Sequence, residues 1–288
     1  DGTFWVVRET KKGKRWFKVN KSVKSPRGYG DYSPVARKGG PTYSPTERKK
    51  RQDPSVAKLG LSMDKIQRFE SGLYNKIARN VTGFIGQDPI GRIKQPFNNK
   101  SLRRAVNKYT TDPIMAIGKY GKISLWNTSQ VTDMSKLFEN KVNFNTDISA
   151  WDVSRVTNMR SMFEGAEKFN KPIGNWDVGK VEDMSSMFSE AFSFNQPINT
   201  RAVVYPNGIR YLAWNVSNVK DMNNMFAFAI SFNKPIDRWN VSNVKDMSKM
   251  FRGARDFSQP IDSWDVSNVR DMKEILLGSR LYRPRWFR

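Results

Sequence analysis

The sequence contains no cysteine and no histidine among its 288 residues. Without them the chain cannot form a Ser-His-Asp triad, a cysteine nucleophile, a zinc site with thiolate or imidazole ligands, or a disulfide. A catalytic site built from carboxylates or lysine alone is still possible. The lack of disulfides is typical of proteins from a reducing compartment, or of a particle assembled in one.

Long apolar runs are absent as well. No apolar segment approaches the roughly 18 residues needed to span a membrane, and residues 1–10 lack the charged-then-apolar layout of a signal peptide. We therefore expect a soluble chain without a membrane span.

Positive charge is abundant but unevenly placed. The chain has 50 Lys and Arg against 27 Asp and Glu, a net charge of +23. Residues 1–122 hold 28 basic and 9 acidic residues, residues 123–279 hold 18 of each, and residues 280–288 hold four arginines and no acid. A basic arm and a basic tail thus flank a neutral body, which indicates acidic or polyanionic partners for the two ends.

The neutral body is built from a repeat. Six tryptophans stand 25, 25, 38, 25 and 25 residues apart, and each is followed at fixed distances by Val, Met, Phe or Leu, a second aromatic residue and, in five repeats, Ile. The interval of 38 residues contains an insertion at about residues 199–212 with a turn at 205–208. The predicted repeat core comprises Trp126, Trp151, Trp176, Trp214, Trp239, Trp264, Met134, Met159, Met184, Met222, Met247, Met272, Phe138, Phe163, Phe188, Phe226 and Phe251.

Each repeat predicts a strand-like segment, a turn, about two helical turns and a loop. Apolar residues at i, i+3, i+4 and i+7, as in 159–166, favour the short helix, and Ile173–Val178 looks extended. One unit of this size cannot bury enough apolar surface to fold alone, so the units must stack. The expected fold class is therefore an α/β repeat solenoid of six 25-residue units over residues 126–279.

Three recurring features have alternative interpretations. The Met-x-x-Met pairs could be soft-metal ligands, but their helical spacing favours core packing. The tryptophan column could be a carbohydrate platform if it faced solvent, although core packing is favoured. The acid seven residues after each Trp, replaced once by Asn158, could suggest calcium or acid-base chemistry, but helix capping explains it better.

The unit Trp-Asp-Val-Ser-Asn-Val-x-Asp-Met-x-x-Met-Phe-x-x-Ala-x-x-Phe-Asn-x-Pro-Ile, taken from Trp151 to Ile261, resembles the BspA-like leucine-rich-repeat surface-protein family, also known from mycoplasma lipoproteins. The resemblance implies a leucine-rich-repeat-like solenoid for display or protein contact, without catalytic residues and without a cofactor. It also marks residues 99–125 as an N-terminal cap, with Pro113 at the first position of a helix. The chain departs from the bacterial members in having neither an export signal nor a lipobox cysteine.

The flanking segments complete the predicted organisation. Residues 1–60 form an extended basic arm with a β-hairpin at 3–19, residues 61–98 hold an amphipathic helix and a linker, and residues 280–288 form a basic aromatic tail. The candidate partner-binding residues are Lys11, Lys12, Lys14, Arg15, Arg48, Lys49, Lys50, Arg51, Arg283, Arg285, Trp286 and Arg288.

These features favour a non-enzymatic structural or interaction protein. The basic hairpin also resembles, more weakly, Lys/Arg-rich segments of large DNA virus proteins, which makes a minor capsid protein of a virion the specific hypothesis. Its partners would be other protein subunits of the particle, the capsid proteins, with the arm threading between them. Two alternatives stay open: a BspA-like adhesin at the cell surface, and a nucleic-acid-binding protein that uses arm and tail.

Overall fold

The computed structural model describes the backbone of two short N-terminal segments and most of the chain after them: residues 4–10, 13–19, 95–205 and 208–287. The chain divides into two compact units, residues 1–49 and residues 50–288. Each unit is described by itself.

The first unit contains the two strands of an antiparallel hairpin. β1 (Phe4–Thr10) pairs with β2 (Gly13–Val19) from Phe4 opposite Val19 to Thr10 opposite Gly13. These strands lie in the range where β-branched and aromatic residues predict a hairpin, and their pairing extends up to the connecting turn.

The second unit begins with two helices and a short 3-10 turn: α3 (Asn99–Thr111), α4 (Pro113–Tyr120) and η3 (Ile123–Leu125). The Asn98 side chain caps α3 by accepting a hydrogen bond from the Ser101 N–H, and the Ser101 hydroxyl accepts from the Asn98 N–H. Asp112 caps α4 by accepting from Met115 N at 3.2 Å. These caps fix where the two helices start, and α3 lies next to the first repeat.

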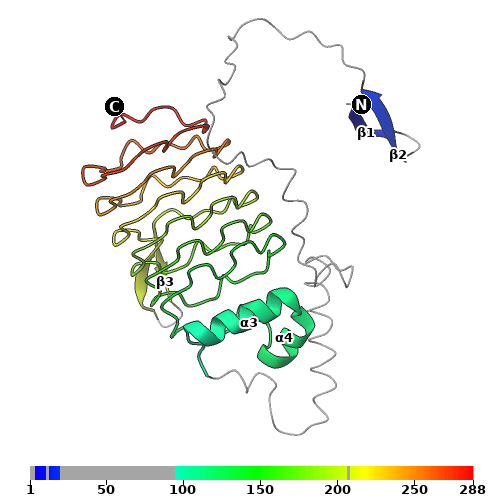
Figure 1. Ribbon diagram of the computed structural model, residues 1–288, viewed down its shortest axis with the longest axis vertical. Coiled ribbons are helices and arrows are strands. Elements are labelled where there is room, and N and C mark those ends of the chain that lie inside the picture. The colour runs from blue at the N-terminus through cyan, green and yellow to red at the C-terminus, as the bar shows by residue number, and fades with distance from the viewer. Residues whose placement is uncertain (1–3, 11–12, 20–94, 206–207, 288) are drawn as a thin grey trace, which may run out of the picture. The chain divides into compact units, whose positions relative to one another are not determined.

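The repeats lie one above another as a stack, residues 126–279 (Figure 1). Neighbouring repeats are joined by four backbone hydrogen bonds in which N–H groups of the earlier repeat donate to carbonyls of the later one. In the first interface the donors Met134, Lys136, Phe138 and Asn140 pair with the carbonyls of Asn158, Arg160, Met162 and Glu164, at 2.9, 2.8, 2.9 and 2.7 Å. The same pattern recurs at each of the next four interfaces.

The segment that carries these donors is a series of turns, so the prediction of two helical turns at this place is wrong. Residues such as Lys136 and Asn140 have φ of 57°, which lies in the left-handed region and interrupts a right-handed helix. Alternate N–H groups therefore point to the next repeat instead of to the residue four positions back. Apart from β3 and β4, strand pairing in the described part of the stack is limited to isolated parallel bridges, and the α/β solenoid class stays a prediction.

The interior of the stack is formed by columns of aromatic side chains. All six repeat tryptophans are buried, and the first five members of the phenylalanine column stack with ring centroids 5.4–5.8 Å apart. Most Trp indole N–H groups donate to an Ile carbonyl two repeats earlier, as Trp214 does to Ile173 at 2.8 Å. The Trp176 indole N–H is buried and has no partner among the described residues. This burial leaves the tryptophan column unable to act as a carbohydrate platform.

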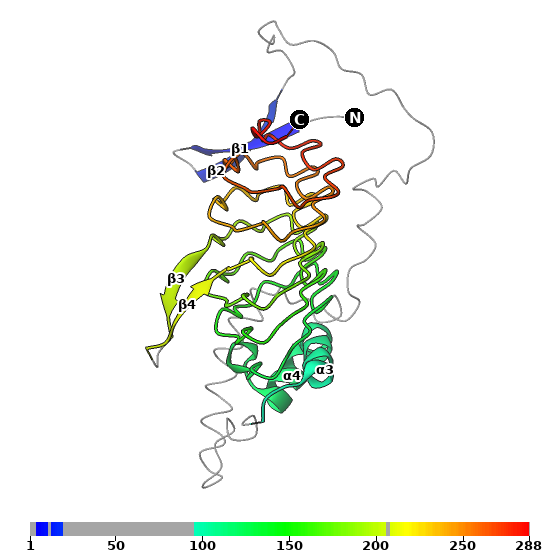
Figure 2. The ribbon, with the colours of Figure 1, turned by 90° about the vertical axis from the view of Figure 1, so that its left-hand side faces the viewer.

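The insertion between the third and fourth repeats forms a hairpin of β3 (Arg201–Val204) and β4 (Arg210–Ala213). It projects from the side of the stack (Figure 2). The Tyr211 hydroxyl donates to the carbonyl of Asn175, and the Tyr205 hydroxyl donates to Asp177 Oδ2 at 3.4 Å. These contacts hold Tyr205, next to the turn of the hairpin, and Tyr211 in β4 against residues 175–177.

The entry into this insertion depends on a glycine. A Cβ atom on Gly174 would lie 2.5 Å from the carbonyl oxygen of Pro197, a backbone atom that cannot move without opening the stack. We expect Gly174→Ala to lower the stability by about 2 kcal/mol, measured by thermal unfolding. Gly118→Ala is the control, because a Cβ there meets nothing within 4 Å and should stabilise α4 by about 0.5–1 kcal/mol. An unchanged melting temperature for Gly174→Ala would contradict the close approach.

Candidate functional site

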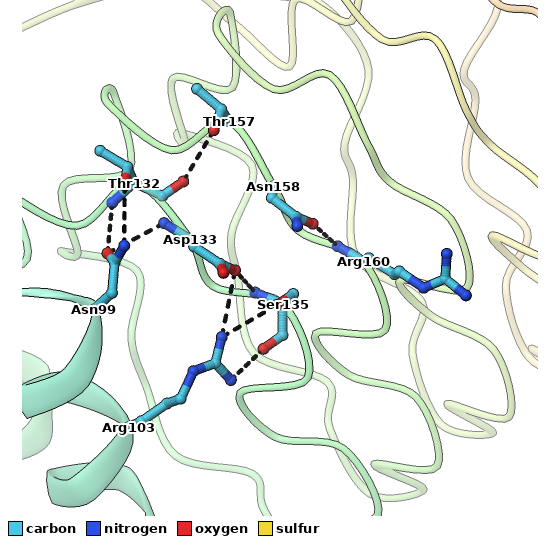
Figure 3. A network of polar contacts seen from close by, with 8 residues as sticks. All are labelled: Asn99, Arg103, Thr132, Asp133, Ser135, Thr157, Asn158 and Arg160. Carbon is cyan, nitrogen blue, oxygen red and sulfur yellow. Dashed lines mark hydrogen bonds and ion pairs between the residues drawn. The ribbon is translucent and has the colours of Figure 1, made fainter.

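The end of the stack that precedes the first repeat is closed by side chains of α3 (Figure 3). Asn99 Oδ1 accepts hydrogen bonds from Thr132 N at 2.9 Å and Asp133 N at 3.2 Å. Inside the stack the corresponding N–H of Thr157 donates to the carbonyl of Thr132 at 2.8 Å. The Asn99 amide oxygen therefore takes the place of the carbonyl that a preceding repeat would supply.

Arg103 supplies the complementary donor. Its guanidinium donates to the carbonyl of Ser135, to Ser135 Oγ at 3.1 Å and to Asp133 Oδ1 at 3.3 Å. One repeat further on, the equivalent carbonyl of Arg160 accepts from the Lys136 N–H at 2.8 Å. Arg103 thus replaces a backbone N–H of a missing repeat (Figure 3). We call this surface, Asn99 and Arg103 on Thr132–Ser135, the closed end.

A column of acidic side chains runs along the stack next to the ladder. In most repeats a carboxylate oxygen accepts from the N–H two residues on, as Asp133 Oδ1 does from Ser135 N at 2.7 Å, and Asn158 Oδ1 does the same for Arg160 N at 2.9 Å. Each of these acids therefore caps a turn. The prediction that they cap helices is wrong, because the segment that follows each acid is a series of turns. Among the described residues no group of three or more acids is arranged to hold a metal ion.

Stacking brings these carboxylates close to one another. Burial, joined by the charges of Asp183 and Asp246, raises the pKa of the Asp221 carboxyl, while hydrogen bonds from Asn223 oppose the shift. Repulsion between like charges in this column destabilises the fold, and the hydrogen bonds that the carboxylates accept from the turns offset this destabilisation.

Asparagines form a second polar column for which the sequence analysis assigned no role. Asn170 N donates to Asn145 Oδ1, Asn195 N to Asn170 Oδ1 and Asn233 N to Asn195 Oδ1, each at 3.0 Å. The signal was present in the sequence, because an Asn follows the second phenylalanine of the first four repeats. These side chains fix the register of neighbouring repeats.

The inserted hairpin offers an exposed face on the side away from its contacts with the third repeat. Leu212 and Val204 are 50% and 56% exposed, and β-pairing places them on one face with Arg210. On the opposite face, burial raises the pKa of the Tyr205 hydroxyl to about 12, with Asp177 adding to the shift. Tyr205 therefore stays a neutral donor at physiological pH.

The predicted partner-binding residues fall in three places. Lys14 and Arg15 lie in β2, and three others lie in the tail, described below. Seven lie outside the described residues, as does the predicted amphipathic helix within 61–98: Lys11, Lys12, Arg48, Lys49, Lys50, Arg51 and Arg288.

The tail packs on the last repeat. The Trp286 indole N–H donates to the carbonyl of Ile261 at 2.9 Å, the type of bond that Trp264 makes with Ile236 at 3.1 Å. The Tyr282 hydroxyl and the Arg285 N–H both donate to Asp262, and these bonds lower the pKa of its carboxyl. Trp286 therefore acts as a cap within the chain, whereas Arg283 and Arg285 stay exposed.

The recurring repeat also identifies the family. Residues 100–209 and 207–284 match the model of a family described as "Mycoplasma protein of unknown function, DUF285". The chain belongs to this family. The resemblance to a mycoplasma-type repeat family is thereby confirmed. Comparison with curated proteins gave no match, and comparison with solved structures gave none. No described helix of this DUF285 chain is long and apolar enough to cross a membrane.

The acidic column gives a pH-dependent prediction. Because folding raises the pKa of Asp221, its protonated form favours the fold at low pH, and this stabilisation is lost as the pH rises through the folded-state pKa. We expect Asp221→Asn to raise the melting temperature by about 1–2 °C at pH 7 and to lose that advantage near pH 3. Asn158→Asp, which adds a charge between Asp133 and Asp183, should have the opposite effect at pH 7. Equal melting curves for wild type and Asp221→Asn at both pH values would contradict the raised pKa of Asp221.

The closed end gives a second prediction. Arg103→Met removes the donor to Ser135 and should cost about 1 kcal/mol, the usual range for a partly exposed charged hydrogen bond. Arg104→Met on the same helix is the control, since Arg104 is exposed. Chemical unfolding would measure both variants, and an equal loss in both would show that Arg103 does not replace a ladder donor.

Proposed function

We propose that the chain is a non-enzymatic contact protein whose repeat stack forms a rigid support for other proteins. The observation that supports this most is the use of the recurring residues: Trp, Met and Phe are buried, and the recurring Asp and Asn cap turns or join repeats. What remains at the surface differs between repeats, as at Glu182, Lys220 and Arg270. The recurring residues thus stabilise the stack, and the surface residues that vary between repeats are available to contact a partner.

The proposed class for this scaffold is a leucine-rich-repeat-like solenoid with six units. Its support is the bridging of each repeat to the next at residues 133, 158, 183, 221, 246 and 271. A rigid stack of this kind offers a long side surface without needing a cleft.

The narrower proposal is a minor capsid protein in a virion, whose basic arm threads between neighbouring subunits. It is supported by the uneven distribution of charge: the net charge is +19 in residues 1–122 and zero in residues 123–279. Acidic surfaces of neighbouring subunits would offset the repulsion among the basic residues of this arm.

Limited proteolysis of the isolated full chain, followed by mass spectrometry, tests this role. We expect cleavage within residues 1–60, resistance of residues 95–287, and a monomer by sedimentation. A monomer whose first 60 residues resist cleavage would contradict an arm that neighbours must order.

Nucleic-acid binding by arm and tail is the second candidate, favoured by the exposed Arg283 and Arg285 and by the charge of the arm. It predicts filter binding to DNA or RNA that weakens steeply between 50 and 200 mM salt, roughly tenfold or more. Absence of binding at low salt would remove it. A cell-surface adhesin of the BspA-like type is the remaining alternative, and labelling of intact cells with an antibody to the stack would favour it over a particle component.

A further inference from the structure

The second end of the stack lies at the sixth repeat. In the fifth repeat the N–H groups of Met247, Lys249, Phe251 and Gly253 donate to the sixth repeat at 2.8–2.9 Å. Within the described residues, the equivalent N–H groups of the sixth repeat have no acceptor: Met272, Glu274, Leu276 and Gly278. Four aligned ladder donors therefore face away from the stack.

Apolar side chains are exposed at the same place. Val266, Val269, Met272 and Leu276 are only partly buried, and Leu277 is 55% exposed. In the fifth repeat the corresponding core positions are at most 1% exposed: Val241, Val244, Met247 and Phe251. The tail covers the other side of the last repeat through Leu281 and Trp286.

Unpaired donors and half-buried core residues thus coincide on one surface. We call it the open end and define it by Val266, Val269 and residues 272–278. We propose that the open end binds an extended acidic segment of a partner protein, which continues the stack as a further repeat would. The proposal rests on the contact role proposed above and names the kind of partner.

Two properties of the open end determine the chemistry of that partner. Its four donors need backbone carbonyls spaced at alternate residues, which an extended or repeat-like segment provides. Exposed basic residues lie within the open end and directly beside it in the sequence: Lys273 within it, and Arg270 and Arg280 on either side. Among the nearby acids, Glu274 pairs with Arg252 at 3.2 Å and Asp271 with Lys273 at 3.9 Å, whereas Arg270 and Arg280 are exposed, so an acidic segment is the better match.

A second copy of the chain does not satisfy the open end. Two open ends facing each other would bring donors against donors. The closed end has the matching carbonyls, but Arg103 occupies that of Ser135 and α3 lies over this surface. Head-to-tail growth into a filament is blocked in the same way.

The chain itself supplies probes for a binding test. A synthetic peptide of residues 176–198 has the repeat pattern with four acidic residues and one lysine, and a peptide of residues 239–261 has the same pattern with four basic and two acidic residues. Fluorescence anisotropy with the full chain should show binding of the acidic peptide, and at least tenfold weaker binding of the basic peptide.

Matched variants locate the binding surface. Leu277→Asn at the open end should weaken binding of the acidic peptide about fivefold or more. Leu125→Asn, at an equally exposed leucine of η3 (59%), should leave it within twofold. Both side chains are more than half exposed, and thermal unfolding would show that both variants fold.

Several results would overturn the proposal: no binding of the acidic peptide at millimolar concentration, equal affinity for the two peptides, or an equal effect of the two variants. Self-association of the full chain that Leu277→Asn abolishes would assign the open end to a second copy and would also overturn it. If the acidic peptide does not bind but proteolysis cleaves the arm as expected, only the proposed partner of the open end is overturned. If the arm of a monomer resists proteolysis, the threading role is overturned instead.

Discussion

Four backbone hydrogen bonds at each repeat interface run in one sense along the segment of turns, from an N–H of the earlier repeat to a carbonyl of the later one, while flanking bonds such as Thr157 N–H to the Thr132 carbonyl run the other way. This polarity follows from the left-handed residues at two positions of each repeat, such as Ser186 and Glu190, which turn alternate N–H groups toward the next repeat. Each bond contributes only about 1 kcal/mol, but four of them fix the register in which the aromatic columns stack. The buried core depends on this ladder.

Because these four hydrogen bonds run in one direction, one end of the stack presents carbonyl groups and the other presents N–H groups, and different segments of the chain lie at the two ends. At one end α3 provides an amide oxygen from Asn99 and a guanidinium from Arg103, so that the Thr132 N–H and the Ser135 carbonyl have partners. At the other end the tail continues the tryptophan column with Trp286 but does not reach the ladder donors. Helix α3 thus covers one end of the stack, whereas the ladder N–H groups at the other end have no acceptor among the described residues, and this difference supports the contact function that we propose.

Much of the interior could be predicted from the sequence. The 25-residue period placed Trp, Met and Phe at positions that the structure buries, except Met272, which is only partly buried, and Asp112 before Pro113 marked the start of α4. The short helix was predicted wrongly because apolar spacing of three and four residues fits a series of turns as well. Nothing in the identity of Lys136 or Ser186 signals a positive φ, and the last repeat has the same conformation at Glu274.

The sequence by itself determined the repeat, the split of charge, the exclusion of cysteine and histidine chemistry, and the membership in a family. Only the tertiary structure decided which polar groups are satisfied and which are left over. Arg103 and Ser135 are 32 residues apart, and Trp286 becomes a cap only when it reaches Ile261. The physical reason is that a hydrogen bond between repeats depends on how the turns are registered in space, which no single repeat encodes.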